Sequence, residues 1–171
     1  YKLGKYMPFF DRTIEYMILT HPHADHVTGL VDVLRRYRVK NILFVDTPYE
    51  TPDYAAWIEA VHEEGANILT PSQRETIRFG DAVLSIVFPT QNAVGQPIDN
   101  VNNASFVAKF SYGDVDALFV GDAEKEEEAE LLQSGADLSS EVLKAGHHGS
   151  KTSSTPEFLD AVRPEAAIIS A

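Results

Sequence analysis

The sequence predicts a single layered α/β domain over residues 1–171. Strand-like and helix-like segments alternate along the chain, hairpin-like strand pairs occupy its middle, and no repeat or interdomain linker interrupts it. The hydrophobic content of 44% and the charged content of 23% are typical of a globular protein, and the length is sufficient to bury a core. The central hairpins argue against a pure series of βαβ units.

In the first half of the chain, short apolar runs predict strands, and apolar residues spaced three and four apart predict helices. We expect a strand over 14–20, a helix over 29–37, a strand over 41–45, a helix over 52–64 and a strand over 66–69. Thr51 is expected to cap the second helix, because a hydroxyl followed by Pro52 is a favourable helix start.

The second half of the chain predicts hairpins first and then further helices. We expect strands over 76–79 and 82–88, a polar loop over 89–103, strands over 104–110 and 115–120, a helix over 124–133, a strand over 141–145, a short helix from 156 and a strand over 166–170. The acidic run over 124–130 is expected to lie on a solvated helix face, since charged residues are rarely buried.

The composition excludes several classes of function. The chain contains no cysteine, which removes disulfides, thiolate nucleophiles and cysteine-based zinc sites. No apolar run approaches the ~20 residues of a membrane span, so this segment is expected to make no membrane contact. The formal net charge of −12 argues against broad nucleic-acid affinity, which requires clustered Lys and Arg.

The densest chemical signal is a histidine-rich motif that follows the first expected strand. His21, His23, Asp25 and His26 place four candidate metal ligands within six residues. Imidazole and carboxylate suit zinc, manganese or iron. Because one short segment is poorly able to aim all four at one ion, the spacing favours two adjacent metals, with His21 and His23 on one and Asp25 and His26 on the other. The alternative is a loop of solvated histidines.

Two later motifs also follow expected strands. Asp122 stands after Gly121 at a strand end, where a carboxylate can bridge two metals, although Gly-Asp is also an ordinary turn. His147 and His148 follow the strand over 141–145. Adjacent side chains on an extended chain point in opposite directions, so we expect one of the two histidines to face the metals, and we favour His148.

Together these motifs carry a family resemblance. The segments HPHADH (21–26), GDAE (121–124) and VLKAGHHGSKTSS (142–154) resemble the metallo-β-lactamase superfamily, and more narrowly the hydrolase domain of ComEC-type DNA-uptake competence proteins. The resemblance implies an αββα sandwich, here expected to be truncated at both ends, with the metal site at one edge between two sheets. It also implies a hydrolase that uses hydroxide activated by two divalent ions, Zn²⁺ or Mn²⁺, on the extracytoplasmic side of a bacterial membrane.

The resemblance assigns roles residue by residue. The expected metal ligands are His21, His23, Asp25, His26, Asp122 and His148. The expected catalytic residues are Asp25, Asp122 and His147, as proton acceptors and as a hydrogen-bond partner of a transition-state oxygen. The expected substrate-binding residues are Asn103, Ser105, Ser150 and Lys151.

One ligand of the superfamily is missing from its usual interval. Most members have another ligand histidine between the first motif and the bridging aspartate, and here that interval contains only His62, which we expect on a solvated helix face. Asn102 or Asn103 stands near the position of the missing ligand, and an asparagine binds metal weakly. We therefore expect the first metal to be held loosely or completed by water.

Three functions remain open at this point. The first is a metal-dependent phosphodiesterase, most simply a nuclease acting on single-stranded DNA, whose contact with DNA the charge of −12 restricts to the area around the metals. The second is a hydrolase of a small ester, lactone or β-lactam on the same metals. The third is a non-catalytic module that keeps the fold. The sequence leaves the oligomeric state open.

Overall fold

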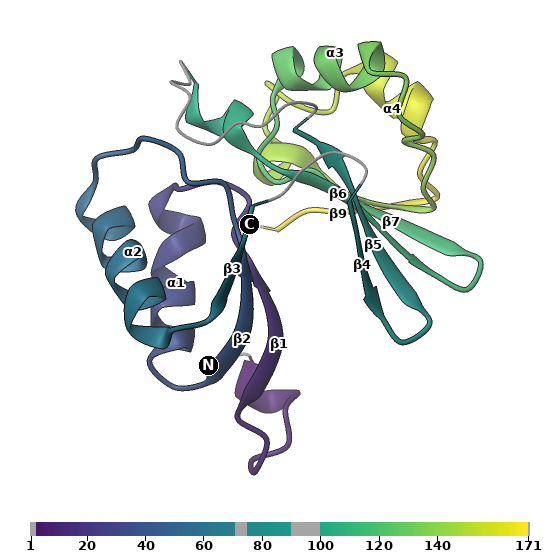
Figure 1. Cartoon of the computed structure of the whole chain (residues 1–171). Helices are drawn as coiled ribbons and strands as arrows, with labels where there is room; N and C mark the ends of the chain where they lie inside the picture. Colours follow the sequence, from purple (N-terminus) through teal and green to yellow (C-terminus); the bar gives the residue numbers. More distant parts are fainter. Residues whose placement is uncertain (1–2, 71–74, 90–99, 171) are drawn as a thin grey trace.

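Two β-sheets face each other between two pairs of helices (Figure 1). The computed structural model describes residues 3–70, 75–89 and 100–170. The first sheet is parallel, in the order β1-β2-β3, and α1 and α2 cover its outer face. Its elements are β1 (Thr13–Ile18), α1 (Ala24–Leu34), β2 (Arg38–Leu43), α2 (Pro52–Glu64) and β3 (Asn67–Leu69). The expected αββα sandwich is thereby confirmed.

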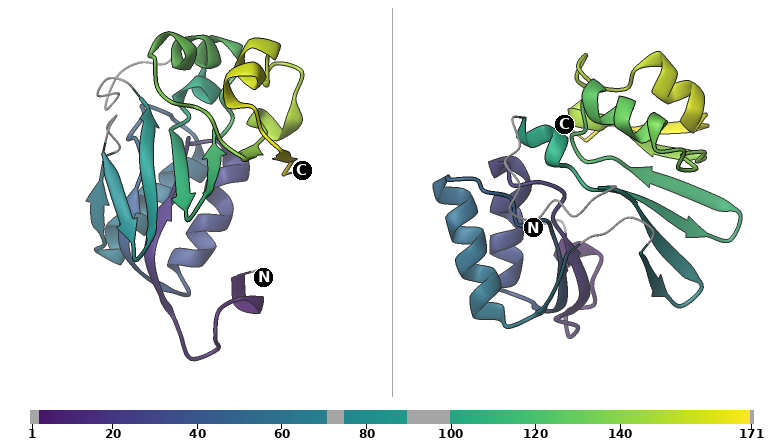
Figure 2. Two further views of the ribbon diagram at one scale, coloured as in Figure 1. Left: turned by 90° about the vertical axis from the view of Figure 1, so that its right-hand side faces the viewer. Right: turned by 45° about the horizontal axis from the view of Figure 1, so that its top comes forward.

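The second sheet has six strands in their sequence order, and α3 and α4 cover it (Figure 2). Pairing is antiparallel from β4 to β7 and parallel from β7 to β9. Its elements are β4 (Thr76–Phe79), β5 (Ala82–Phe88), β6 (Val107–Tyr112), β7 (Val115–Phe119), α3 (Lys125–Gln133), β8 (Val142–Lys144), α4 (Pro156–Val162) and β9 (Ala166–Ile168). Three short 3-10 turns complete the described chain: η1 (Leu3–Lys5), η2 (Val101–Ala104) and η3 (Gly146–Gly149).

The apolar core is divided among three layers, as the sandwich requires. Trp57 of α2 is fully buried in the layer between the first sheet and its helices. Phe158 of α4 is fully buried in the layer between the second sheet and its helices. Leu43 and Phe106 lie in the layer between the two sheets. Burial of apolar area on both faces of each sheet therefore fixes the position of the strand ends.

The capping signals around α2 act as the sequence predicts. The hydroxyl of Thr51 accepts a hydrogen bond from the amide of Tyr54 at 3.3 Å, and Pro52 is the first helical residue. Gly65 ends the helix with a φ of 66°, a left-handed conformation that glycine adopts without a steric penalty.

Three expected elements have other bounds in the structure, and one of them, the strand expected over 41–45, occupies 38–43. The helix expected over 29–37 occupies 24–34, because polar residues fill its first turn and give no apolar periodicity there. The strand expected over 104–110 begins only at Val107, because the 3-10 turn η2 precedes it. The side chain of Asn100 starts this turn by accepting a hydrogen bond from the backbone amide of Asn102 at 3.1 Å.

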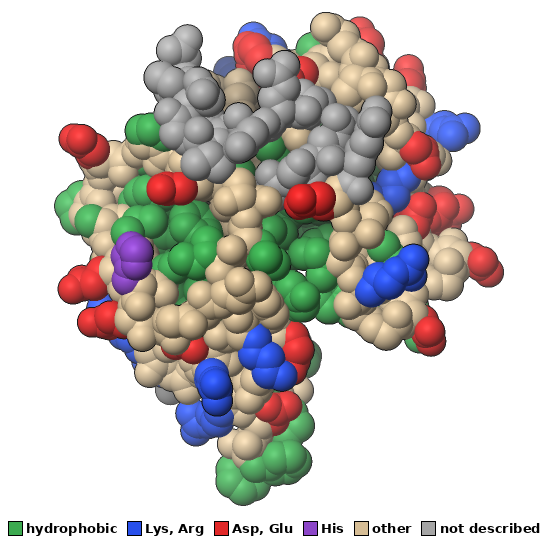
Figure 3. All heavy atoms as spheres, in the orientation of Figure 1, with side chains coloured by type: hydrophobic (Ala, Val, Ile, Leu, Met, Phe, Trp, Pro, Cys, Tyr) green, Lys and Arg blue, Asp and Glu red, His purple; other side chains and the backbone are tan. Residues whose placement is uncertain are grey.

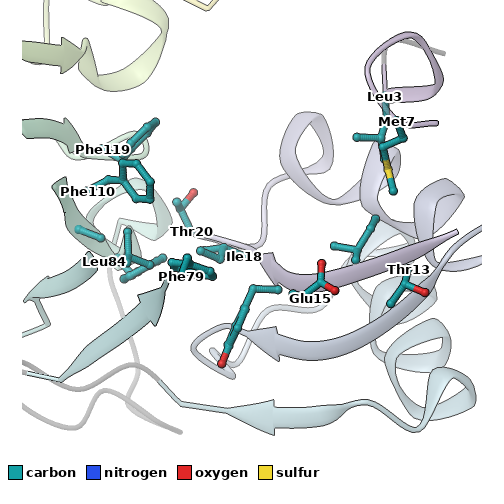
Figure 4. A pocket seen from close by; sticks show the side chains of 14 residues that line it. Leu3, Met7, Thr13, Glu15, Ile18, Thr20, Phe79, Leu84, Phe110 and Phe119 are labelled. Atoms are coloured by element: carbon teal, nitrogen blue, oxygen red, sulfur yellow. The ribbon is translucent and has the colours of Figure 1, made fainter. Parts of the chain in front are cut away.

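An apolar groove of about 710 Å³ separates β1 from the inner face of the second sheet (Figures 3 and 4). Its lining includes Ile18, Phe79, Leu84 and Phe110, and it contains none of the clustered histidines. Thr20 is the one lining residue next to the first histidine motif. The clustered histidines therefore lie outside this groove. No helix of the described segments has the length and apolarity needed to cross a bilayer.

Two glutamates of α3 depart from the expected solvated face. Glu127 and Glu128 are almost fully buried. Glu128 accepts hydrogen bonds from the amides of Ser154 and Thr155, so its carboxylate is satisfied. Neither carboxyl oxygen of Glu127 makes a hydrogen bond within the described residues. Burial therefore raises the pKa of Glu127 well above its ordinary value, and the neighbouring charges of Glu130 and Glu128 add to the shift.

The Glu127→Gln substitution is expected to stabilise the fold increasingly as the pH rises. Because the pKa of Glu127 is raised in the folded state, its protonated form contributes fully to stability below the unfolded-state pKa. This contribution is lost as the pH rises through the range up to the folded-state pKa. Glutamine has no proton to lose. Urea unfolding at pH 5 and pH 8 should show the stability difference between variant and parent growing with pH. Glu128→Gln is the control and should destabilise at both pH values; a pH-independent effect of Glu127→Gln would contradict the prediction.

Candidate metal centre

The candidate ligands come from three loops that follow strand ends. The first histidine motif follows β1 and runs into α1, whose first turn contains Asp25 and His26. Asp122 follows β7, and His148 lies in η3 after β8. β7 and β8 pair in parallel, so the loops that follow them leave the sheet at the same edge.

Four ligand atoms meet at one point. One atom each from Asp25, His26, Asp122 and His148 lies within 4.8 Å of the other three, and in the described part of the chain this is the one such group of three or more. The Oδ2 atom of Asp122 is 3.3 Å from Nε2 of His26 and 3.3 Å from Nε2 of His148. The Nε2 atom of His148 is also 3.1 Å from Oδ2 of Asp25.

His21 reaches the same carboxylate from deeper in the fold. Its side chain is buried, and its Nε2 atom is 3.8 Å from Oδ2 of Asp122. Its Nδ1 atom lies 3.1 Å from the hydroxyl of Thr20 and 3.3 Å from that of Ser105, which orients the ring. The ring of His23 is half-buried and packs 5.0 Å, centroid to centroid, from that of His21.

The charge states of these groups suit a cation. Burial lowers the pKa of His21 to about 3, and the neighbouring His26 contributes in the same direction, so the ring is neutral at pH 7. Burial alone would raise the pKa of Asp122, but the hydrogen-bonding contact and charge of His26, the charge of Lys144 and, at the low pH where His21 is protonated, the charge of that ring outweigh it and hold this pKa well below its usual range. A neutral imidazole beside an ionised carboxylate is the form in which both bind metal.

Hydrogen bonds from two neighbouring segments fix the position of the turn that contains Asp122. The Oγ atom of Ser105 accepts a hydrogen bond from the backbone amide of Asp122 at 2.9 Å. The Nζ atom of Lys144 donates one to the carbonyl oxygen of Gly121 at 2.7 Å. Gly121 has a φ of 53°, and a Cβ atom there would lie 2.6 Å from Oγ of Ser105. Ser105 was expected to bind substrate, but it is fully buried, and its hydroxyl instead holds Asp122 and His21.

The two adjacent histidines diverge because they lie in a turn and not on an extended chain. They were expected on an extended chain, but His147 and His148 have left-handed φ angles of 42° and 55° in the turn η3. Nδ1 of His148 lies 2.6 Å from the carbonyl oxygen of Ser170. Since a carbonyl only accepts, this Nδ1 carries the proton and Nε2 is left for the four-ligand group.

His147 points instead to Glu124. Its Nδ1 atom is 2.8 Å from Oε1 of Glu124, and the same carboxylate accepts from Thr152 at 3.0 Å. Asn100 and Asn102 donate to it at 2.8 and 3.1 Å. Glu124 therefore joins three segments beside the metal ligands, whereas the acidic run that contains it was expected on a solvated helix face. Its position two residues after Asp122 was the available signal.

The remaining expected substrate-binding residues differ in accessibility. The side chain of Asn103 accepts the amide of Glu124 at 3.0 Å and is half-buried. The hydroxyl of Ser150 lies 3.0 Å from that of Thr152. Lys151 is exposed in the turn that follows η3. Of these residues, Lys151 is the most free to meet a ligand from solvent.

The residues fit a metal centre. The Nε2 atoms of His21, His26 and His148 are buried, yet none of them makes a hydrogen bond within the described residues. Leaving three buried ring nitrogens unsatisfied is costly unless a cation occupies the space between them and the carboxylates. Imidazole with carboxylate is a donor set for zinc, manganese or iron, and does not by itself choose among them.

Replacing Gly121 by alanine should disturb the centre, while the same change at Gly113 should not. Both glycines have left-handed φ angles, of 53° and 59°, but a Cβ on Gly113 meets nothing within 4 Å. Both variants bear the backbone penalty, and Gly121→Ala adds a clash with Ser105 worth about 1–3 kcal/mol. Thermal unfolding and metal titration should show a larger loss for Gly121→Ala; equal effects would contradict the argument.

Comparison with known proteins agrees with this geometry. The family model described as "Metallo-beta-lactamase superfamily" matches residues 9–171. ComE operon protein 3 of Bacillus subtilis is 30% identical over 94% of this chain and 20% of its own length. Recombination protein 2 of Haemophilus influenzae is 26% identical over 96% of this chain and 19% of its own length. The chain therefore spans about a fifth of these relatives.

Solved structures support the fold alone. CmlA, a diiron β-hydroxylase from Streptomyces venezuelae, superposes with a TM-score of 0.58 at 14% identity, over 94% of this chain and 35% of its own. A shorter curated match, competence protein ComA of Neisseria gonorrhoeae, is 44% identical over 40% of this chain and 10% of its own length. The expected resemblance to ComEC-type proteins is confirmed, and the chain belongs to the metallo-β-lactamase superfamily.

Proposed function

We propose that this chain is a metal-dependent phosphodiesterase that cleaves DNA. The observation that supports it best is the group of Asp25, His26, Asp122 and His148, whose ligand atoms all lie within 4.8 Å of one another. The relatives named for competence and recombination supply the DNA context. Divalent ions bound by these residues would lower the pKa of water and neutralise charge on the attacked phosphorus group.

The chain's own residues divide the remaining tasks. Asp122 is buried and shared by three imidazoles, so its role is to position the centre. The side chain of Asp25 is 59% exposed, which makes it the better candidate to accept a proton from a reacting water. The carboxylate of Glu124 accepts from Nδ1 of His147, so Nε2 of the neutral ring can accept a proton from water, and only the protonated ring could donate to a substrate oxygen.

The acidic surface limits how DNA can bind. With a net charge of −12, the chain lacks the clustered basic residues that track a DNA backbone over many nucleotides. Lys151 is exposed, and Lys144 lies 3.5 Å from Oδ1 of Asp122, so positive charge is present beside the ligands. The proposed contact is therefore short, covering a few nucleotides around the metal centre.

Cleavage of labelled single-stranded DNA tests the proposal. With Mn²⁺, Zn²⁺ or Mg²⁺, the unaltered chain should cut the strand, and Asp122→Asn and His148→Ala should each lower the rate at least about 100-fold, because each removes a ligand. His62→Ala is the matched control, since His62 is exposed on α2 away from the ligand group, and should keep the parent rate. Absence of cleavage with every metal would overturn the proposal, and turnover of nitrocefin in its place would favour a small-molecule hydrolase.

A further inference from the structure

We propose that the end of the sandwich opposite the candidate metal centre binds the surface of an anionic lipid bilayer. The binding surface, here called the basic-aromatic tip, consists of residues 3–12, which precede β1, and residues 35–40, which lead from α1 into β2. No apolar run of the chain approaches the length of a membrane span, but a loop that lies in the interface needs none. The proposed contact therefore replaces the expectation of no membrane contact, and it is independent of the reaction proposed above.

The tip lies at the start of the first sheet, whereas the metal ligands follow its strand ends. Thr13 of β1 pairs with Arg38 of β2, and the amide of Arg38 donates to the carbonyl of Arg12 at 2.8 Å. The Nη1 atom of Arg12 donates to the carbonyl of Arg36 at 3.4 Å, and its guanidinium lies 5.8 Å from the ring centroid of Tyr37. The two segments therefore form one surface, and the loop before β1 projects from it at the lower end of the molecule (Figure 1).

Three aromatic side chains of the tip are almost entirely exposed. Tyr6 is 86% exposed, Phe9 89% and Phe10 77%, and they belong to a run of five apolar residues over 6–10. The next most exposed large apolar side chain in the described part of the chain is that of Tyr112, at 63%. Figure 3 shows apolar side chains at the lower tip of the molecule, with Lys and Arg side chains on the surface above them. A contiguous apolar surface of this kind marks a site of contact with another molecule or with a membrane.

Basic side chains accompany the aromatic residues. The tip contains six of the chain's 14 Lys and Arg residues, namely Lys5, Arg12, Arg35, Arg36, Arg38 and Lys40. Asp11 is the one acidic residue within it, and Asp32 and Glu15 are acidic neighbours, the latter paired with Lys40 at 3.3 Å. Among the described residues, no ion pair or hydrogen bond engages the exposed guanidinium groups of Arg35 and Arg38. In a chain with a net charge of −12, the tip is therefore a local concentration of free positive charge.

The geometry of the aromatic residues favours a bilayer over single-stranded DNA. Proteins that bind single strands stack successive bases on open aromatic faces along a basic groove. The rings of Phe9 and Phe10 instead pack edge to face, with centroids 5.7 Å apart and planes at 82°, on a projecting loop. Perpendicular rings on adjacent residues offer no parallel faces to two successive bases. An apolar loop with cationic neighbours matches the lipid interface, where aromatic rings lie at the acyl boundary and Lys and Arg lie among the headgroups.

Charge determines which lipid surface fits and how the chain is oriented on it. Lys and Arg close to an anionic leaflet are attracted to it, and this attraction decays within a Debye length, about 10 Å at moderate salt. The acidic remainder of the chain is repelled by the same leaflet and therefore faces away from it. In this orientation the edge with the metal ligands faces solution.

Co-sedimentation with lipid vesicles tests the proposal. The chain is mixed, in the presence of a chelator that prevents bridging by metal ions, with vesicles of phosphatidylcholine alone or of phosphatidylcholine with phosphatidylglycerol. We expect binding to the vesicles that contain phosphatidylglycerol and at least about tenfold weaker binding to phosphatidylcholine alone. Binding to the anionic vesicles should weaken as the salt concentration rises.

Removal of the two phenyl rings tests the apolar contribution. Phe9→Gln combined with Phe10→Gln should lower the affinity for anionic vesicles at least about tenfold, because the apolar area that enters the interface is lost. The matched control is Tyr112→Gln combined with Val115→Gln, which removes two exposed apolar side chains of the β6–β7 hairpin and should leave binding unchanged.

Removal of two positive charges tests the electrostatic contribution. Arg35→Gln combined with Arg38→Gln should lower the affinity for anionic vesicles at least about tenfold and reduce its salt dependence. The control is Arg78→Gln combined with Lys125→Gln, which removes two exposed basic side chains outside the tip and should bind as the parent does. Circular dichroism checks the fold of all four double variants.

A tryptophan at position 9 distinguishes insertion from adsorption. The natural Trp57 is fully buried, so a change in emission of Phe9→Trp on vesicle binding reports on the tip. We expect this emission to shift to the blue with anionic vesicles and to be quenched by brominated acyl chains. Tyr112→Trp should show neither change.

Each remaining outcome would overturn the inference. These outcomes are no binding to anionic vesicles, equal binding by the parent and both tip variants, and unshifted emission of Phe9→Trp. Metal-free binding of a single-stranded oligonucleotide that is lost with the two phenyl rings, in place of vesicle binding, would assign the tip to nucleic acid. Because the tip is remote from the metal ligands, DNA cleavage without vesicles should be the same in the tip variants as in the parent, and loss of either activity leaves the other testable.

Discussion

The arrangement of the whole centre depends on one buried carboxylate, that of Asp122. Its Oδ2 atom lies 3.3–3.8 Å from the Nε2 atoms of His21 and His26, in the segment after β1, and of His148, in the turn after β8. Three partly or fully buried imidazoles converge on a single oxygen only because the loops after β1, β7 and β8 end at one edge of the sandwich. Losing this charge would remove the nearest carboxylate from three buried ring nitrogens that have no hydrogen-bond partner among the described residues, and with it a charge that balances a bound cation.

The support for Asp122 explains why small residues surround it. Gly121 must adopt a left-handed φ and approach Ser105 closely, and any side chain there would displace the hydroxyl that holds both the Asp122 amide and the His21 ring. Lys144 fixes the same turn from β8 through the carbonyl of Gly121. The turn is therefore positioned by one residue from each neighbouring segment, which is how a loop becomes rigid enough to hold a metal ligand.

The sequence predicted the fold well where local signals and tertiary packing agree. The caps of α2 at Thr51 and Gly65 are local, and the structure has them as expected. The start of α1 was missed because its first turn is polar, and apolar periodicity detects only the face that packs on the sheet. The burial of Glu127 and Glu128 was missed because it is a tertiary effect that an acidic run conceals.

In the candidate site, too, the sequence predicts local motifs but not roles that depend on tertiary contacts. The metal-ligand motifs were visible because several histidines and carboxylates rarely gather by chance. The role of Ser105 was not, since a serine that binds a substrate and one that orients a histidine look alike in sequence; only the 3.3 Å contact with Nδ1 of His21 and complete burial distinguish them. The turn η3 was missed as well, because two consecutive non-glycine residues with left-handed φ angles are uncommon and no sequence pattern predicts them.

The net charge of −12 and a polyanionic substrate are compatible if positive charge is supplied at one point. At long range the acidic protein and DNA would then repel each other weakly or not at all. At moderate salt, the interaction between exposed charges more than about 10 Å apart is largely screened. Binding would depend on contact with the metal centre, where Lys144 adds to the charge of the ions. A nuclease of the proposed kind would hold DNA only close to the metal ligands. Under the proposed function, the same acidic surface that disfavours general DNA affinity would restrict recognition to the reacting phosphate.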